Sequence, residues 1–171
     1  MHNFLSTKKT IFLLPAVLLF GVLFSQAQTK PRESLHGLHG VFLYIHPVGH
    51  DVEAGGLTTE QVKIVVEKSL KQAGLTVYNE PQPAEGSANL VVIIDIVKHP
   101  QGAFLYSVEV SLLQEVHLAR TKEADPFPAQ TWGSRALGLT SPNRTDLILE
   151  PLKAKVDDFI ADYKAANKGA N

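Results

Sequence analysis

The sequence predicts an α+β fold in which a mostly antiparallel sheet of four or five strands carries two helices on one face. Two stretches with apolar residues at helical spacing, 57–74 and 141–166, predict the helices. Segments rich in β-branched and aromatic residues predict the strands, and the last three follow one another as an antiparallel meander. The predicted order of elements is therefore β-α-β-β-β-β-α.

Residues 1–27 have the three parts of a secretory signal peptide. Lys8 and Lys9 supply the positive region, Ile11–Phe24 forms an apolar run, and small residues precede a cleavage site between Ala27 and Gln28. The run is shorter than the roughly 20 residues that a membrane span needs, so a retained anchor is the weaker alternative. We therefore expect no permanent membrane span and a location in the periplasm or the medium.

The mature chain, residues 28–171, is long enough to form a single α+β domain with a substantial core. The sequence has no cysteine, which excludes disulfides, thiolate catalysis and the acylated cysteine of a bacterial lipoprotein. Without the two lysines of the signal, the 16 basic and 17 acidic side chains become 14 and 17, a net charge of −3. This charge argues against nucleic acid as a partner.

The first strand and the first helix have the clearest local signals. Gly40–Val48 is rich in β-branched and aromatic residues, which predicts a strand. Leu57–Gly74 predicts an amphipathic helix, with Thr58 as the N-cap and Gln61 at the third position of a capping box. Gly74 stands where a left-handed residue commonly ends a helix.

The second half of the chain predicts the meander and the last helix. Further strands are predicted at Leu75–Tyr78, Ala88–Lys98, Ala103–Arg120 and Ala129–Leu139. Ala88–Lys98 is almost continuously apolar, which is typical of a central strand buried on both faces. Ser141 followed by Pro142 predicts the start of the last helix, and Pro151 should kink or divide it.

A tight turn at Pro100–Gly102 predicts the register of the strands around it. Residues whose numbers sum to about 202 then face each other. Ile94 pairs with Val108 on a wholly apolar face, which we expect to pack on the helices. Asp95 pairs with Ser107 on the opposite face, called the outer face below.

The loop Thr121–Pro128 predicts the register of the last two strands, with paired numbers that sum to about 250. Trp132 then faces Leu118 on the helix side, and Arg135 faces Glu115 on the outer face as an opposite-charge pair.

The outer face is the predicted binding surface, because it mixes apolar and polar side chains where a solvated face is usually polar. The residues expected to form this surface are Val91, Ile93, Asp95, Leu105, Ser107, Glu109 and Arg135. A protein or a small apolar ligand would bind there, and a homodimer would bury the same face. The alternative is that other segments of this chain cover it.

Two chemical alternatives compete with this interpretation. His36, His39, His46, His50 and Asp51 lie within sixteen positions and suggest a zinc or copper site, for which His46, His50 and Asp51 are the candidate ligands. The loose spacing and the absence of a closed ligand set argue against such a site.

A carboxylate pair suggests a hydrolase-like enzyme of unknown substrate. Asp95 and Glu109 lie on neighbouring strands, but the predicted register places them diagonally on a solvated face, which does not favour acid–base chemistry. No nucleophile elbow, phosphate-binding loop or metalloprotease motif occurs in the sequence.

At the level of topology, the chain resembles small bacterial envelope domains. Examples are the lipoprotein that plugs the lipopolysaccharide translocon and the N-terminal domain of the periplasmic Tol propeller protein. Gly40–Val48, Thr58–Ala73 and the helix after Pro142 carry this resemblance. The missing lipidated cysteine is a departure that argues against membrane tethering. The stretch from Tyr106 to Arg120, with Thr131–Ser134, is also similar to uncharacterised exported bacterial proteins, which implies no activity.

The sequence therefore predicts an exported, non-catalytic binding or accessory domain of the bacterial envelope that needs no cofactor. A metal-binding periplasmic protein that uses the His36–Asp51 cluster, or a hydrolase-like enzyme, is the alternative.

Overall fold

The computed structural model describes residues 31–81, 87–120 and 125–168, so the predicted signal peptide lies outside the described residues. The elements in chain order are η1 Pro31–Leu35, β1 Gly40–Ile45, α1 His50–Ala54, α2 Thr59–Gln72, β2 Thr76–Tyr78, β3 Ser87–Lys98, β4 Phe104–Val116, β5 Phe127–Thr140, η2 Thr145–Ile148 and α3 Leu149–Ala166.

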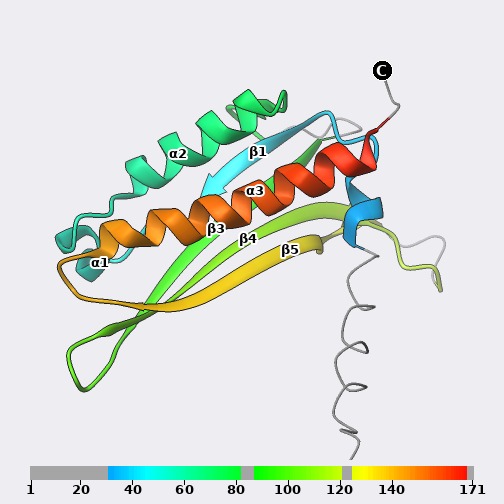
Figure 1. Cartoon of the computed structure of the whole chain (residues 1–171). Helices are drawn as coiled ribbons and strands as arrows, with labels where there is room; N and C mark the ends of the chain where they lie inside the picture. The colour runs from blue at the N-terminus through cyan, green and yellow to red at the C-terminus, as the bar shows by residue number, and fades with distance from the viewer. Residues whose placement is uncertain (1–30, 82–86, 121–124, 169–171) are drawn as a thin grey trace, which may run out of the picture.

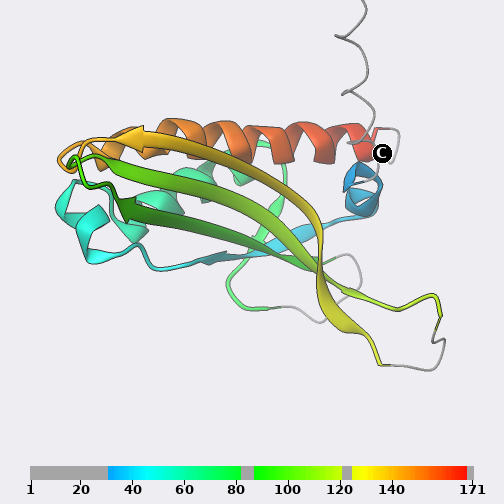
Figure 2. The same ribbon diagram turned by 90° about the horizontal axis from the view of Figure 1, so that it is seen from below.

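The five strands form one mixed sheet in the order β2-β1-β3-β4-β5. β1 is parallel to β2 and to β3, whereas the longer pairs β3–β4 and β4–β5 are antiparallel. The long helices α2 and α3 lie on the same side of this sheet, α3 over β4 and β5 and α2 beside β1 (Figures 1 and 2). The predicted α+β class, with a mostly antiparallel sheet and two helices on one face, is confirmed.

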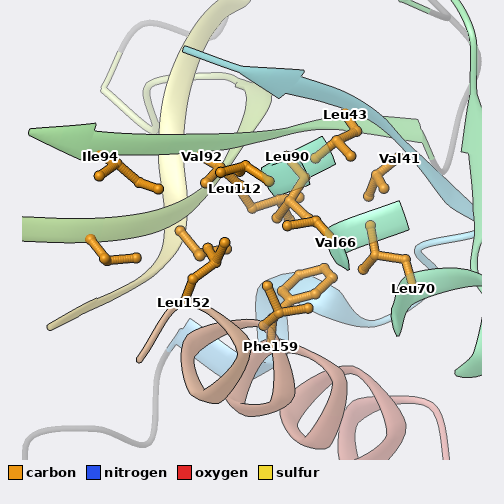
Figure 3. Close-up of a cluster of buried hydrophobic side chains, with 14 of the residues drawn as sticks. Val41, Leu43, Val66, Leu70, Leu90, Val92, Ile94, Leu112, Leu152 and Phe159 are labelled. Atoms are coloured by element: carbon orange, nitrogen blue, oxygen red, sulfur yellow. The ribbon is translucent and has the colours of Figure 1, made fainter. Parts of the chain in front are cut away.

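The core fills the space between the sheet and the two long helices (Figure 3). β3 contributes Leu90 and Val92, α2 contributes Val66, and α3 contributes Leu152 and Phe159, all with fully buried side chains. Buried residues recur every second position on the strand. On the helices they recur every three or four positions, as in Leu152, Val156 and Phe159, so each element turns one apolar side to the same interior.

The predicted register of β3 and β4 is confirmed, because the turn between them is tight. Ile94 lies opposite Val108, and Asp95 lies opposite Ser107. Gly102 adopts a positive φ of 87° in this turn, a conformation that glycine takes without steric cost.

The predicted register of β4 and β5 is wrong by six residues. Trp132 faces Leu112 instead of Leu118, and Arg135 faces Glu109 instead of Glu115. β4 ends at Val116, earlier than expected, so the connection is longer and begins sooner than the loop at Thr121–Pro128. An offset of six is even and keeps every side chain on the same face, so alternation of apolar and polar residues could not detect the error.

The capping of α2 follows the prediction in detail. The Thr58 hydroxyl accepts a hydrogen bond from the Gln61 amide at 3.2 Å, and the Gln61 side chain accepts one from the Thr58 amide at 2.8 Å. Both donors would otherwise lack a partner inside the helix. Gly74, with φ of 88°, follows the helix end as expected.

Other boundaries differ from the prediction. β1 ends at Ile45, and the loop expected after it contains the short helix α1. The last helix is divided as Pro151 suggested: α3 begins at Leu149, so the proline sits in its first turn, where a missing amide donor is tolerated.

Thr145 holds α1 against the start of η2. Its side chain is fully buried, and its hydroxyl donates to the Val52 carbonyl at 2.7 Å. Its amide donates to the Gly55 carbonyl at 3.2 Å, and a Cβ at position 55 would overlap the Pro142 carbonyl oxygen. This close backbone approach, which only glycine permits, fixes the position of α1 beside the end of β3.

The first and last described segments are also bound to each other. The Arg32 guanidinium donates to Asp162 at 2.8 Å. The Asn167 side chain accepts from the Gly37 amide and donates to the Leu35 carbonyl, each at 2.9 Å. η1 is therefore tied to the C-terminal end of α3.

Candidate functional site

An exposed apolar row crosses three strands at one end of the outer face. Val97 on β3 pairs with Leu105 on β4, which pairs with Leu139 on β5. Leu137 follows in the adjacent row, beside Ser107. The exposed fractions are 64% for Val97, 44% for Leu105, 78% for Leu137 and 66% for Leu139. We call these four residues the apolar patch.

The middle of the outer face is more polar and less accessible. Glu109 lies between Ile93 and Arg135, and its carboxylate accepts hydrogen bonds from the Arg135 guanidinium. Val91 and Ile93 are half-buried, and the neighbouring Ser111 is 5% exposed. The part of the predicted surface that projects furthest is therefore the end at Leu105.

The carboxylates considered for acid–base chemistry are not directly opposite each other. Asp95 pairs with Ser107, and Glu109 pairs with Ile93. The Arg135 guanidinium forms an ion pair with the Glu109 carboxylate, whereas Asp95 has no ion-pair partner among the described residues. The arrangement therefore does not bring the two carboxylates together as partners in one acid–base site.

The sequence-based prediction missed Leu137 and Leu139, the two most exposed residues of the apolar patch. The register error caused this, since the expected pairing placed Leu105 opposite a residue beyond β5. A signal in the sequence could have found them. A single register gives three favourable pairs at once: Leu105 with Leu139, Glu109 with Arg135, and Leu112 with Trp132.

A cleft of about 390 Å³ lies beside the end of β3, between this strand and α1. We call it the edge cleft. It is lined by His46, Pro47, Gly49, His50, Asp51, Val52, Ile94, Asp95, Ile96 and Lys98. The cleft follows the carboxyl ends of the parallel strands β1 and β3, the edge at which open α/β sheets commonly bind ligands.

The edge cleft brings His46, His50 and Asp51 together, but His39 lies elsewhere. β1 runs between His39 and His46, which places them at opposite ends of a strand of six residues. His39 instead lines a second cleft of about 460 Å³ beside Gly74 and Asn167. Within residues 31–81, 87–120 and 125–168, no three histidine, aspartate or glutamate side chains are arranged to hold a metal ion.

Comparison with known proteins finds weak structural likeness among solved structures. No protein-family model and no curated protein matches the chain. A solved structure of a minor lipoprotein from Acinetobacter baumannii is similar over 77% of this chain and 94% of that chain, with 9% sequence identity and a TM-score of 0.31. At these values the likeness supports no functional argument. Among the described helices, none is sufficiently long and apolar to cross a membrane.

Proposed function

We propose that this protein is an exported, non-catalytic binding or accessory domain of the bacterial envelope, and that the outer sheet face contacts another protein. The observation that supports this most is the apolar patch. Single exposed apolar residues are ordinary on protein surfaces, but four that neighbour one another across three strands form a contiguous surface.

The shape and surroundings of the patch favour a protein over a small apolar ligand. Small molecules bind mainly in concave sites, and the two clefts described above have none of the four patch residues in their linings. Asp95 and Ser107 border the patch with polar groups. An apolar centre with a polar rim is the usual anatomy of a protein interface.

Export is supported by the sequence of residues 1–27. Expression in a bacterial host should yield a processed protein outside the cytoplasm, with an N-terminus at or near Gln28. Mass spectrometry of the fractionated protein measures this. An intact Met1 on a membrane-bound species would contradict both export and the envelope role.

Photo-crosslinking in producing cells tests the contact surface. A benzoylphenylalanine at position 137 should give an adduct of defined mass, because that position is the most exposed in the patch. The same residue at position 153, on the exposed side of α3, is the matched control and should give none. Leu139→Asp should abolish the adduct formed from position 137.

The mass of the adduct distinguishes the occupants. If the product exceeds the mass of the chain by a constant amount, and this amount differs from the mass of the chain, the partner is a different protein and the proposal is supported. A product of twice the chain mass identifies a homodimer, so the partner would be a second copy of this chain and not a different protein. Absence of any adduct in the bacterium that naturally encodes the protein would contradict the contact surface.

A further inference from the structure

β3 extends beyond its neighbour β1 and leaves part of its edge unpaired. The last residue of β1, Ile45, pairs with Val92, whereas β3 continues to Lys98. The final main-chain bond between these segments is donated by the His46 amide to the Val92 carbonyl at 2.9 Å. The chain then turns away at Pro47 into α1. Among the described residues, no strand occupies the position beside the end of β3 where β1 would continue, which we call the lane.

The backbone groups that face this lane follow from strand geometry. Successive residues of a strand point their amide and carbonyl groups to alternate sides. Since the Val92 carbonyl points toward β1, the groups of Ile94, Ile96 and Lys98 point to the same side, into the lane. The main-chain hydrogen bonds of the described residues include no partner for them on that side.

The opposite edge of the same strand is fully used. Asp95 and Val97 lie opposite Ser107 and Leu105 of β4, and the ladder continues to the turn, where the His99 amide donates to the Ala103 carbonyl at 2.8 Å. Along the same stretch of β3, the main-chain groups of one edge are therefore hydrogen-bonded to β4, and those of the other edge are open.

The edge cleft is the space along this open edge. Ile94 is 5% exposed and Val52 of α1 is 2% exposed, so an apolar wall lies on the helix side of the lane. Asp95 projects on the outer side, and Asp51 lies at the other margin. Neither carboxylate has an ion-pair partner in the described part of the chain, and together they outnumber Lys98, the one ammonium group of the cleft.

We propose that the edge cleft binds an extended peptide segment of a partner protein, which adds to the sheet as a strand beside the end of β3. The amides and carbonyls of Ile94 and Ile96 would bond to the peptide backbone, as in other cases of strand addition. Alternate peptide side chains would face the helix side, against Ile94 and Val52, or the outer side, next to Asp95. This chemistry selects a segment in which apolar and basic residues alternate.

Asp95 borders both this site and the apolar patch, but none of the four patch residues lines the edge cleft, so either proposal can fail alone. The hydrogen-bonding groups of the lane are main-chain groups that any extended segment can satisfy. The carboxylate of Asp95 adds a preference for peptides with a cationic side chain at alternate positions. Uncharged or acidic segments lack this side chain.

Amide hydrogen exchange measured by NMR tests the inference directly. The probe is a seven-residue peptide with blocked ends that alternates valine and lysine, added to the mature protein. Exchange of the Ile94 and Ile96 amides should slow by about tenfold or more on binding, because they gain acceptors. Exchange of the Asp95 and Val97 amides, which already bond to β4, should not change.

Protection that does not alternate along β3, or none at saturating peptide, would overturn the proposal. A peptide of the same sequence with alternate backbone amides methylated is the matched control. It cannot form the ladder and should bind at least about tenfold more weakly.

Variants of the protein separate the backbone and charge contributions. Ile96→Pro removes an amide that faces only the lane, so the ladder with β4 remains and the affinity should fall about tenfold. Asp95→Lys should reverse the preference toward a peptide with glutamate in place of lysine, a result that does not depend on the proline variant folding. Leu139→Asp should leave both peptides unaffected. If Leu139→Asp abolished binding and Asp95→Lys did not, the peptide would bind at the apolar patch and the inference would be wrong.

Discussion

At the scale of single residues, Ile93 and Ile94 illustrate how one strand serves two surfaces. Ile94 points toward the helices and is 5% exposed, whereas Ile93 is half-buried on the outer face opposite Glu109. Sequence alternation together with the tight turn was sufficient to predict these opposite orientations. It was not sufficient to predict how exposed each outer residue is, because exposure depends on neighbours from other strands such as Arg135.

Matched aspartate substitutions test this division. Ile94→Asp places an unpaired carboxylate in the core and should lower the free energy of unfolding by about 4 kcal/mol. Ile93→Asp should cost about 1 kcal/mol, since water reaches that position. Thermal melts followed by circular dichroism measure both. Equal and severe destabilisation would mean that the outer face is as buried as the core.

At the scale of elements, prediction succeeded where the signal was local. The capping box of α2 and the turn at Gly102 depend on residues only three or four positions apart, and both form as expected. The register of β5 depends on a long connection, which imposes no particular pairing. It also depends on a β-bulge, where Leu112 faces Trp132 and Leu113 faces Gln130, so that Thr131 is an extra residue.

The position of the edge cleft could not be predicted for a similar reason. His46, His50 and Asp51 were recognisable as a group, but their pairing with Asp95 and Ile96 requires β1 to end early and α1 to form. The position of α1 depends on Thr145, which lies more than ninety positions from Val52 in the sequence.

The capping box gives a prediction at this scale. Thr58→Ala removes the hydroxyl that accepts from the Gln61 amide and should lower the free energy of unfolding by about 1 kcal/mol. In a domain of this size the corresponding fall in Tm is about 3–4 °C. Lys68→Ala, at an exposed position of the same helix, is the control and should change Tm little. A Thr58 variant as stable as the control would show that the cap contributes nothing measurable.

At the scale of the whole molecule, α3 completes the core. Leu152, Val156 and Phe159 are fully buried between the sheet and α2. The Phe159 ring meets Trp132 of β5 edge to face, with centroids 5.1 Å apart, and the Trp132 indole donates to Asp162 at 3.1 Å. Without α3, one side of β4 and β5 would be an open apolar surface.

A chain that ends at Ile148 should therefore show no cooperative thermal transition and should bind a dye specific for exposed apolar surface. Adding a synthetic peptide of residues 149–168 should restore part of the native circular dichroism signal. A cooperative transition in the truncated chain would mean that the sheet and α2 form a sufficient core.

The hydrogen bonds between η1 and the end of α3 determine when folding can finish. Arg32 and Leu35 acquire their partners Asp162 and Asn167 only after almost the whole chain has been made. An emerging chain cannot complete its core before α3 has been made, because Leu152, Val156 and Phe159 fill part of it. For a protein whose leading residues resemble an export signal, this late completion of the core should keep the chain unfolded while it is transported. It also exposes the apolar segment Leu90–Val97 during that interval, so we expect export to depend on a chaperone that shields it.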